Sequence, residues 1–208
     1  MRKKLKNFWI LRRTKGDVVT TIKGDRCLLK PCVPNDTMEV TKLLIRNKLY
    51  WSTYEPIHLE NYYTEQVQYK KIVEGMHLRS LNREFSYGIY ELNSRYLIGM
   101  ISLYSIKRIP FSSAFIGYSI DEQYSGKGIT SEAVLLVLEF AFNTLRLNRL
   151  EAYVAPGNVA SIRVLEKAGF EKEGLLRKLL YIKGEWVDHF IYAVLSEEYY
   201  KKKAEALN

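Results

Sequence analysis

Two glycines, Gly126 and Gly128, enclose Lys127 in residues 123–128, between a predicted strand and a predicted helix. Glycine lets the backbone turn tightly and approach a ligand closely. The first N–H groups of a helix have no partner inside the helix, and the helix dipole favours negative charge there. A glycine loop at that position therefore suits a pyrophosphate, with Lys127 as a nearby cation. Taken alone, such a pair more often marks a tight turn that binds no phosphate.

Two familiar phosphate loops are excluded by the neighbouring residues. A P-loop ends in Gly-Lys followed by Ser or Thr, whereas Gly128 is followed by Ile129. A dinucleotide-binding fingerprint requires a third glycine where this chain has Ser131, and it lies near the start of its domain. Here the segment lies in mid-chain, after several predicted strands.

A second polar pair, Asn158 and Ser161, begins another predicted helix. Asn158 is placed as the N-cap, whose side chain accepts a hydrogen bond from an early N–H group. Ser161 then falls in the first turn, while Ile162 and Leu165 face the core. Ordinary helix capping explains the two polar residues equally well when they are viewed alone.

The elements that must position these residues form a mixed α/β domain with antiparallel strands first and a strand-helix-strand-helix unit later. Alternating hydrophobicity and turn residues predict seven strands, at residues 26–33, 85–92, 96–106, 113–120, 149–155, 170–182 and 186–195. Helices are predicted from Asn35 or Asp36 to residue 48, and at residues 59–78, 128–145 and 159–168. Tyr69 is among the expected anchors of the second helix.

The net charge of +9 is concentrated at the N-terminus. Residues 1–16 contain no acid and seven basic residues, which are Arg2, Lys3, Lys4, Lys6, Arg12, Arg13 and Lys15. This segment is interpreted either as a solvated, partly disordered terminus or as a docking arm for RNA-rich surfaces such as ribosomes. No apolar run is long enough for a signal peptide or a membrane span, so a cytoplasmic protein without membrane contact is expected.

Cys27 and Cys32 are five residues apart on one predicted extended segment, which places them on opposite faces. We therefore expect reduced thiols and no disulfide. With no nearby histidine they form no zinc site, and no other metal is expected.

Both polar segments, in this order and about 30 residues apart, resemble the GNAT superfamily of acetyl-CoA-dependent N-acetyltransferases. The phrases at residues 116–121, 126–128, 158–161, 166–170 and 174–177 resemble its RimJ/RimL-type branch, which acetylates ribosomal-protein N-termini. The resemblance covers residues 26–199. It implies a mixed, mostly antiparallel seven-stranded sheet with helices on both faces and a central parallel strand pair splayed around acetyl-CoA. Residues 1–25 are then a basic extension, 26–200 the acetyltransferase domain and 201–208 a charged tail.

The resemblance also implies roles for particular residues. The pantetheine arm pairs with the strand near Tyr118, the amides of residues 125–130 hold the pyrophosphate, and Asn158 contacts the pantetheine. Ser161 lies near the sulfur and protonates the departing thiolate after direct attack by the amine. The cofactor residues so implied are Tyr118, Ser119, Ile120, Ser125, Gly126, Lys127, Gly128, Ile129, Thr130, Asn158, Ser161 and Lys167.

The general base departs from the family pattern. Relatives often place a glutamate where this chain has Phe115 or Leu180. Glu84, at the start of a predicted strand, is the substitute that we expect to act, through water, together with Ser161 and Asn158. The competing interpretation of Glu84 is a solvated surface acid.

On the acceptor side, Trp51, Tyr54 and Asp188 are placed as substrate-binding residues, with core packing as the alternative for the two aromatics. An α-amine has a pKa of about 7.7–8.0 and a lysine amine one of about 10.4, so weak base assistance favours an α-amine. The expected acceptor is a protein N-terminus, as in a ribosomal protein. A polyamine, an aminoglycoside and a non-catalytic acyl-CoA-binding or ribosome-associated protein remain alternatives, and either a monomer or a homodimer is compatible.

Overall fold

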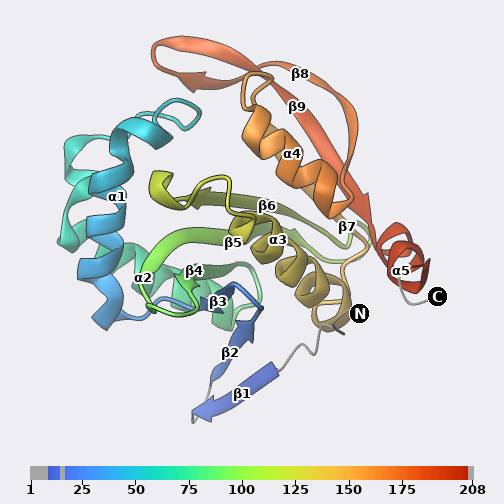
Figure 1. Ribbon diagram of the computed structural model, residues 1–208, viewed down its shortest axis with the longest axis horizontal. Helices are drawn as coiled ribbons and strands as arrows, with labels where there is room; N and C mark the ends of the chain where they lie inside the picture. The colour runs from blue at the N-terminus through green and yellow to red at the C-terminus, as the bar shows by residue number, and fades with distance from the viewer. Residues whose placement is uncertain (1–8, 15–16, 206–208) are drawn as a thin grey trace.

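A single mixed sheet forms the centre of the computed structural model, which describes residues 9–14 and 17–205 (Figure 1). In these ranges nine strands follow the order β1-β2-β3-β4-β5-β6-β7-β9-β8. They are β1 (Trp9–Thr14), β2 (Asp17–Lys23), β3 (Cys27–Lys30), β4 (Phe85–Glu91), β5 (Leu97–Lys107), β6 (Ser113–Ile120), β7 (Arg149–Val154), β8 (Glu171–Ile182) and β9 (Glu185–Leu195).

The expected count of seven strands is wrong because β1 and β2 precede the seven that the sequence predicts. They form an antiparallel hairpin, and Ile22 and Lys23 pair with Leu29 and Leu28 of β3. Part of the segment expected as an extension thus continues the sheet. The basic side chains of the proposed docking arm lie outside the described side chains.

Five α-helices surround the sheet in the described part of the chain. They are α1 (Thr37–Trp51), α2 (Glu65–Ser80), α3 (Ile129–Glu139), α4 (Val159–Ala168) and α5 (Ser196–Glu205). A 3-10 turn, η2 (Glu60–Tyr63), precedes α2, whose N-cap Thr64 divides the single helix that the sequence predicts. Tyr69, an expected anchor of that helix, is 50% exposed instead. Residues 201–205 of the expected charged tail continue α5, a helix that was not predicted from the sequence.

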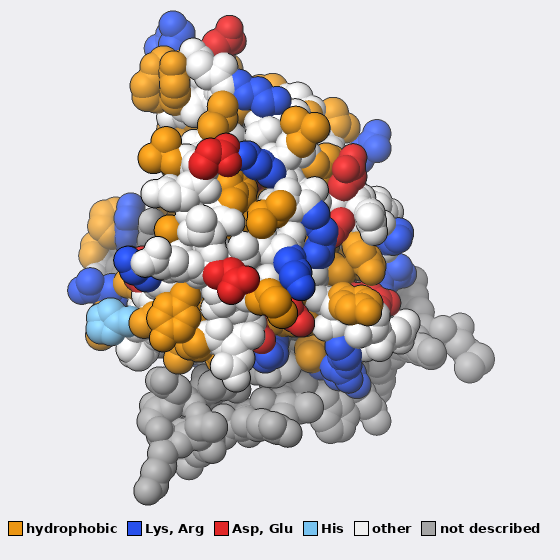
Figure 2. Space-filling model, turned by 90° about the vertical axis from the view of Figure 1, so that its left-hand side faces the viewer, with side chains coloured by type: hydrophobic (Ala, Val, Ile, Leu, Met, Phe, Trp, Pro, Cys, Tyr) orange, Lys and Arg blue, Asp and Glu red, His pale blue; other side chains and the backbone are white. Residues whose placement is uncertain are grey.

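Two hydrophobic clusters lie on opposite faces of the sheet. Residues of α3 and α4 pack with alternate strand residues such as Leu29 and Ile101, whereas α1 and α2 pack with Tyr90 and Leu97. Figure 1 shows α1 and α2 grouped at one side and α3 and α4 at the other. The outer surface of the α1–α2 side carries interspersed positive, negative and hydrophobic side chains (Figure 2).

The two cysteines are free and lie in different clusters, Cys27 with the α3 face and Cys32 with the α1 face, as their spacing predicts. Burial raises the pKa of both thiols, to about 11 for Cys32, so both favour the neutral form. Within residues 9–14 and 17–205 no helix is both long and apolar enough to cross a membrane. In the same ranges no group of three His, Cys, Asp or Glu side chains is arranged around a metal position.

Candidate acetyl-CoA cleft and acceptor site

The central strands β6 and β7 separate along their length, as the family resemblance implies. They are parallel and pair only from Ser113 with Arg149 to Phe115 with Glu151, although both continue further. The N–H of Asp121, which follows β6, donates to Ile98 O of β5 (2.7 Å). Because main-chain groups alternate in an antiparallel pair, those of Tyr118 and Ile120 point away from β5 into the gap. The main chain of Ser119 instead faces β5.

The glycine loop lies between β6 and the N-terminus of α3 and is open. Gly126 and Gly128 have φ of +74° and +77°, a region that side chains other than glycine rarely adopt. No described residue accepts a hydrogen bond from the N–H groups of Gly126, Lys127 or Gly128. A Cβ on Gly126 would meet nothing within 4 Å. Free, exposed donors at a helix N-terminus are what an anion requires.

The start of this loop is fixed by α1. Asp121 is 3% exposed and accepts hydrogen bonds from the guanidinium of Arg46 and from Gln123 N–H. Burial would raise the pKa of Asp121, but these hydrogen bonds hold it below its ordinary value. Asn47 Oδ1 accepts from Glu122 N–H at 3.0 Å. Asp121, which the sequence analysis left without a role, therefore anchors the loop to the helix on the acceptor side.

On the other side of the gap, Asn158 caps α4 as predicted, since its Oδ1 accepts from Ser161 N–H at 3.1 Å. The Ser161 hydroxyl lies 2.9 Å from the phenol oxygen of Tyr118, which crosses from β6. Burial raises the pKa of Tyr118 to about 12, although its hydrogen bond to Ser161 opposes the rise. The neutral phenol can donate to Ser161 and leave the serine proton free for another acceptor.

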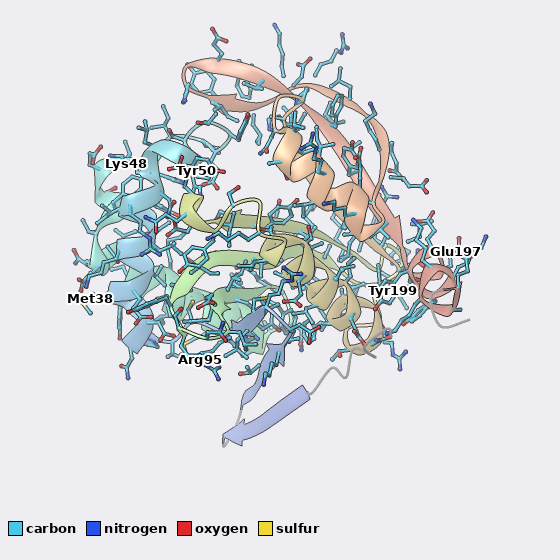
Figure 3. The ribbon with its side chains drawn as sticks, in the orientation of Figure 1. Met38, Lys48, Tyr50, Arg95, Glu197 and Tyr199 are labelled. Atoms are coloured by element: carbon cyan, nitrogen blue, oxygen red, sulfur yellow. The ribbon has the colours of Figure 1, made fainter. Side chains whose placement is uncertain are left out.

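Three aromatic side chains from the end of α1 contact the cleft. Tyr50 OH donates to Ser125 Oγ (3.3 Å), Trp51 Nε1 donates to Ile120 O (2.8 Å), and Tyr54 OH donates to Gly157 O (2.9 Å). They reach the glycine loop, the open strand edge and the turn before α4. Figure 3 shows Tyr50 and Lys48 at one end of α1 and Met38 at the other. Tyr50 was missed because no local pattern relates it to Ser125, 75 residues away.

The remaining predicted site residues lie further from this gap. Glu84 accepts from Ser86 Oγ (2.6 Å) beside β4, two strands or roughly 10 Å from β6. Asp188 accepts from Lys178 N–H (2.7 Å) at an irregularity of the β8–β9 ladder, a contact within the hairpin. Lys167 is exposed in the last turn of α4, roughly 13 Å along the helix axis from Asn158.

One carboxyl group that the sequence analysis did not consider is Glu55, in the turn after α1. The Glu55 N–H donates to Trp51 O (3.0 Å), so Glu55 lies one turn after Trp51, whose indole contacts Ile120. Burial raises the pKa of the Glu55 carboxyl to about 7. The sequence contains no signal for this shift, since it does not show that Tyr62 and Tyr63 of η2 fold against α1 beside Glu55.

The family model of the acetyltransferase (GNAT) domain matches residues 26–171. The chain is 40% identical over 177 residues to "Probable N-acetyltransferase YjcK" of Bacillus subtilis, covering 85% of this chain and 98% of that protein. Its fold is similar to the crystal structure of ribosomal-protein-S5-alanine acetyltransferase from Vibrio fischeri, with a TM-score of 0.82, 28% identity and coverage of 86% and 98%. It is also similar in fold to Mycobacterium smegmatis RimJ in complex with CoA-disulfide, with a TM-score of 0.79, 23% identity and coverage of 86% and 89%.

Proposed function

The chain belongs to the GNAT acetyltransferase family, and we propose that it transfers the acetyl group of acetyl-CoA to the N-terminal α-amine of a protein, of the ribosomal-protein type. The observation that carries the proposal is the open glycine loop beside a gap between two parallel strands, with Asn158 and Ser161 across that gap. The named substrate of the Vibrio fischeri relative supports the choice of a ribosomal protein.

The cofactor position follows from where unpaired donors and acceptors lie. The pyrophosphate binds the free N–H groups from Gly126 to Thr130, where the dipole of α3 favours negative charge, whereas the Ser125 N–H already donates to Glu122 O (3.1 Å). The pantetheine arm runs along the main-chain groups of Tyr118 and the N–H of Ile120, which face the gap, while Ile120 O accepts from Trp51 Nε1. This route brings the thioester toward Ser161 at the start of α4.

The chemistry is a direct attack of a neutral amine on the thioester carbonyl. The Tyr118 N–H, aimed into the gap, is placed to polarise the carbonyl oxygen. The Ser161 hydroxyl, held by Tyr118 OH, donates its proton toward the sulfur as the C–S bond breaks. Neither cysteine acts as an acyl carrier, because Cys27 is buried in the α3 cluster and burial keeps both thiols protonated.

The absence of carboxylates at Phe115 and Leu180 favours an acceptor that is partly neutral at physiological pH. An α-amine meets this condition, and a lysine amine does so about once in a thousand molecules. The basic residues in the first 16 positions extend the proposal to a weak contact with ribosomal RNA, which high salt should weaken.

The test is an acceptor screen with acetyl-CoA, read as release of free thiol. Peptides with a free Ala or Ser N-terminus are compared with three other acceptors. These are Nα-acetylated peptides whose only amine is a lysine side chain, spermidine, and an aminoglycoside. We expect turnover of the free N-terminal peptides above all others. Activity confined to spermidine or the aminoglycoside would contradict the α-amine assignment, and coenzyme A binding without turnover of any amine would favour a non-catalytic role.

A further inference from the structure

Glu55 is one of the residues that line a hollow between the end of α1 and η2. The lining of this hollow is mainly aromatic and apolar, and its members are Leu44, Lys48, Trp51, Ser52, Glu55, Pro56, His58, Tyr62 and Tyr63. Glu55 is half-buried there, and no described residue donates a hydrogen bond to its carboxyl group. A half-buried carboxyl group without a partner favours its neutral form, and a cation placed beside it would stabilise the ionised form.

The cations around this hollow already have partners. Lys48 Nζ, on α1, forms an ion pair with Glu60 Oε1 (2.5 Å) and lies 4.6 Å from the centre of the Tyr63 ring. Lys71 Nζ, on α2, lies over the Tyr62 ring at 5.5 Å. His58 stacks on Tyr62 at 3.8 Å between ring centres, and burial, with Lys71 second, lowers its pKa and favours the neutral ring.

The hollow adjoins the proposed reaction path through Trp51. The indole lines the hollow and also donates to Ile120 O, on the edge of β6 that faces the gap. Tyr54, the residue before Glu55, reaches Gly157 next to the Asn158 cap. The turn that carries Glu55 is therefore held against both walls of the gap, on the side of the sheet covered by α1.

We propose that Glu55 binds the ammonium form of the acceptor's amine and accepts its proton. The inference rests on the proposed acetyltransferase function and supplies the base that neither Phe115 nor Leu180 provides. An incoming ammonium group provides the cationic partner that the Glu55 carboxylate lacks. The aromatic rings that line the hollow also attract a cation.

The proton balance is complete with the groups present. One ammonium N–H bond breaks as an O–H bond forms on the Glu55 carboxylate, and the neutral nitrogen attacks the thioester carbon. The C–S bond breaks as the sulfur takes a proton from Ser161. The nitrogen gives up its second proton, which reprotonates Ser161 through solvent, and the neutral amide product leaves. Glu55 then returns its proton to solvent, which its half-exposed position allows. A base with a pKa of about 7 is well matched to an α-amine of about 8.

The test measures kcat/KM for a free N-terminal peptide from pH 5.5 to 9 in the wild type, Glu55→Gln, Glu55→Asp and Glu65→Gln. Glu65 is an exposed acid in the first turn of α2 and provides a matched loss of charge. Glu55→Gln is expected to lower kcat/KM about 100-fold and to remove the inflection near pH 7. Glu55→Asp should restore part of the activity, and Glu65→Gln should match the wild type. Coenzyme A affinity should be the same in all four proteins.

A second acceptor separates base catalysis from packing. With an amine of low pKa, already neutral at the assay pH, Glu55→Gln should lose less than tenfold. Wild-type activity and an unchanged inflection in Glu55→Gln would overturn the role of Glu55 while leaving the acetyltransferase assignment intact. Absence of wild-type turnover on every amine would instead overturn the function. In that case the binding of the peptide to the coenzyme A-loaded protein tests whether Glu55 holds the ammonium group. Equal peptide affinity of the wild type and Glu55→Gln would show that it does not.

Discussion

The Tyr118 phenol oxygen lies 2.9 Å from the Ser161 hydroxyl oxygen, so β6 and α4 hold two hydroxyl groups together across the gap. The residues are 43 positions apart in sequence. Tyr118 is neutral at any physiological pH because burial raises its pKa to about 12, and it therefore remains a hydrogen-bond donor. This pair is the arrangement on which thiolate stabilisation depends in the proposed mechanism.

Replacing Tyr118 by Phe should lower kcat about tenfold, since one hydrogen bond of about 1.4 kcal/mol is lost at the leaving group. Coenzyme A affinity should change less than threefold. Tyr200→Phe is the control, because it also removes a tyrosine hydrogen bond, to Asn143 Oδ1 at 2.8 Å, but on α5. Steady-state kinetics and calorimetric coenzyme A titration provide the measurements, and equal kcat values for both variants would contradict the role of the pair.

Gly128→Ala should weaken coenzyme A binding at least tenfold. Its φ of +77° costs an alanine about 1 kcal/mol, and relaxation of the backbone moves the N–H groups that face the pyrophosphate. Gly184→Ala is the matched control, with φ of +89° in the β8–β9 turn and no atom within 4 Å of its added Cβ. Both variants should lose similar thermal stability, but only Gly128→Ala should lose affinity. Equal affinities would show that the glycine loop does not hold the cofactor.

Asp121→Asn should destabilise the fold by about 1–3 kcal/mol at pH 7, because the charged hydrogen bonds from Arg46 and Gln123 N–H weaken. The folded pKa of Asp121 is lowered, so its contribution is present above the unfolded value of about 3.9 and is lost as the pH falls below it. Urea unfolding from pH 6 to 3 should therefore bring the wild type and the variant together at the acidic end. A constant difference across that range would contradict this prediction.

Glu55→Gln should become more stable than the wild type as the pH rises. The folded pKa of Glu55 is raised to about 7, so the folded wild type loses stability between its unfolded value of about 4.3 and pH 7, as the half-buried carboxyl ionises. The variant lacks this loss, and its advantage at pH 8 should be about 1–3 kcal/mol. Denaturant unfolding at pH 5 and pH 8 measures the change; an equal difference at both values would show that the carboxyl is not desolvated.

Local signals in the sequence determined much of this protein. The bounds of β6 and α4 agree with the prediction, because strand alternation and the Asn158 cap are read from a few adjacent residues. The glycine loop was recognisable for the same reason, since Gly126 and Gly128 specify a local backbone conformation. The short, parallel pairing of β6 and β7 followed from the resemblance of these segments to the family and not from either strand alone.

Tertiary structure alone decided which polar side chains are buried and what they contact. Asp121 had no distinguishing neighbour in sequence, yet Arg46, 75 positions earlier, makes it the anchor of the loop. Glu55 owes its raised pKa to aromatic residues that η2 brings against α1, and Tyr50, Trp51 and Tyr54 owe their roles to distant carbonyl and hydroxyl groups. Burial and electrostatics depend on atoms that meet only when the chain is folded, so the composition of one segment does not specify them.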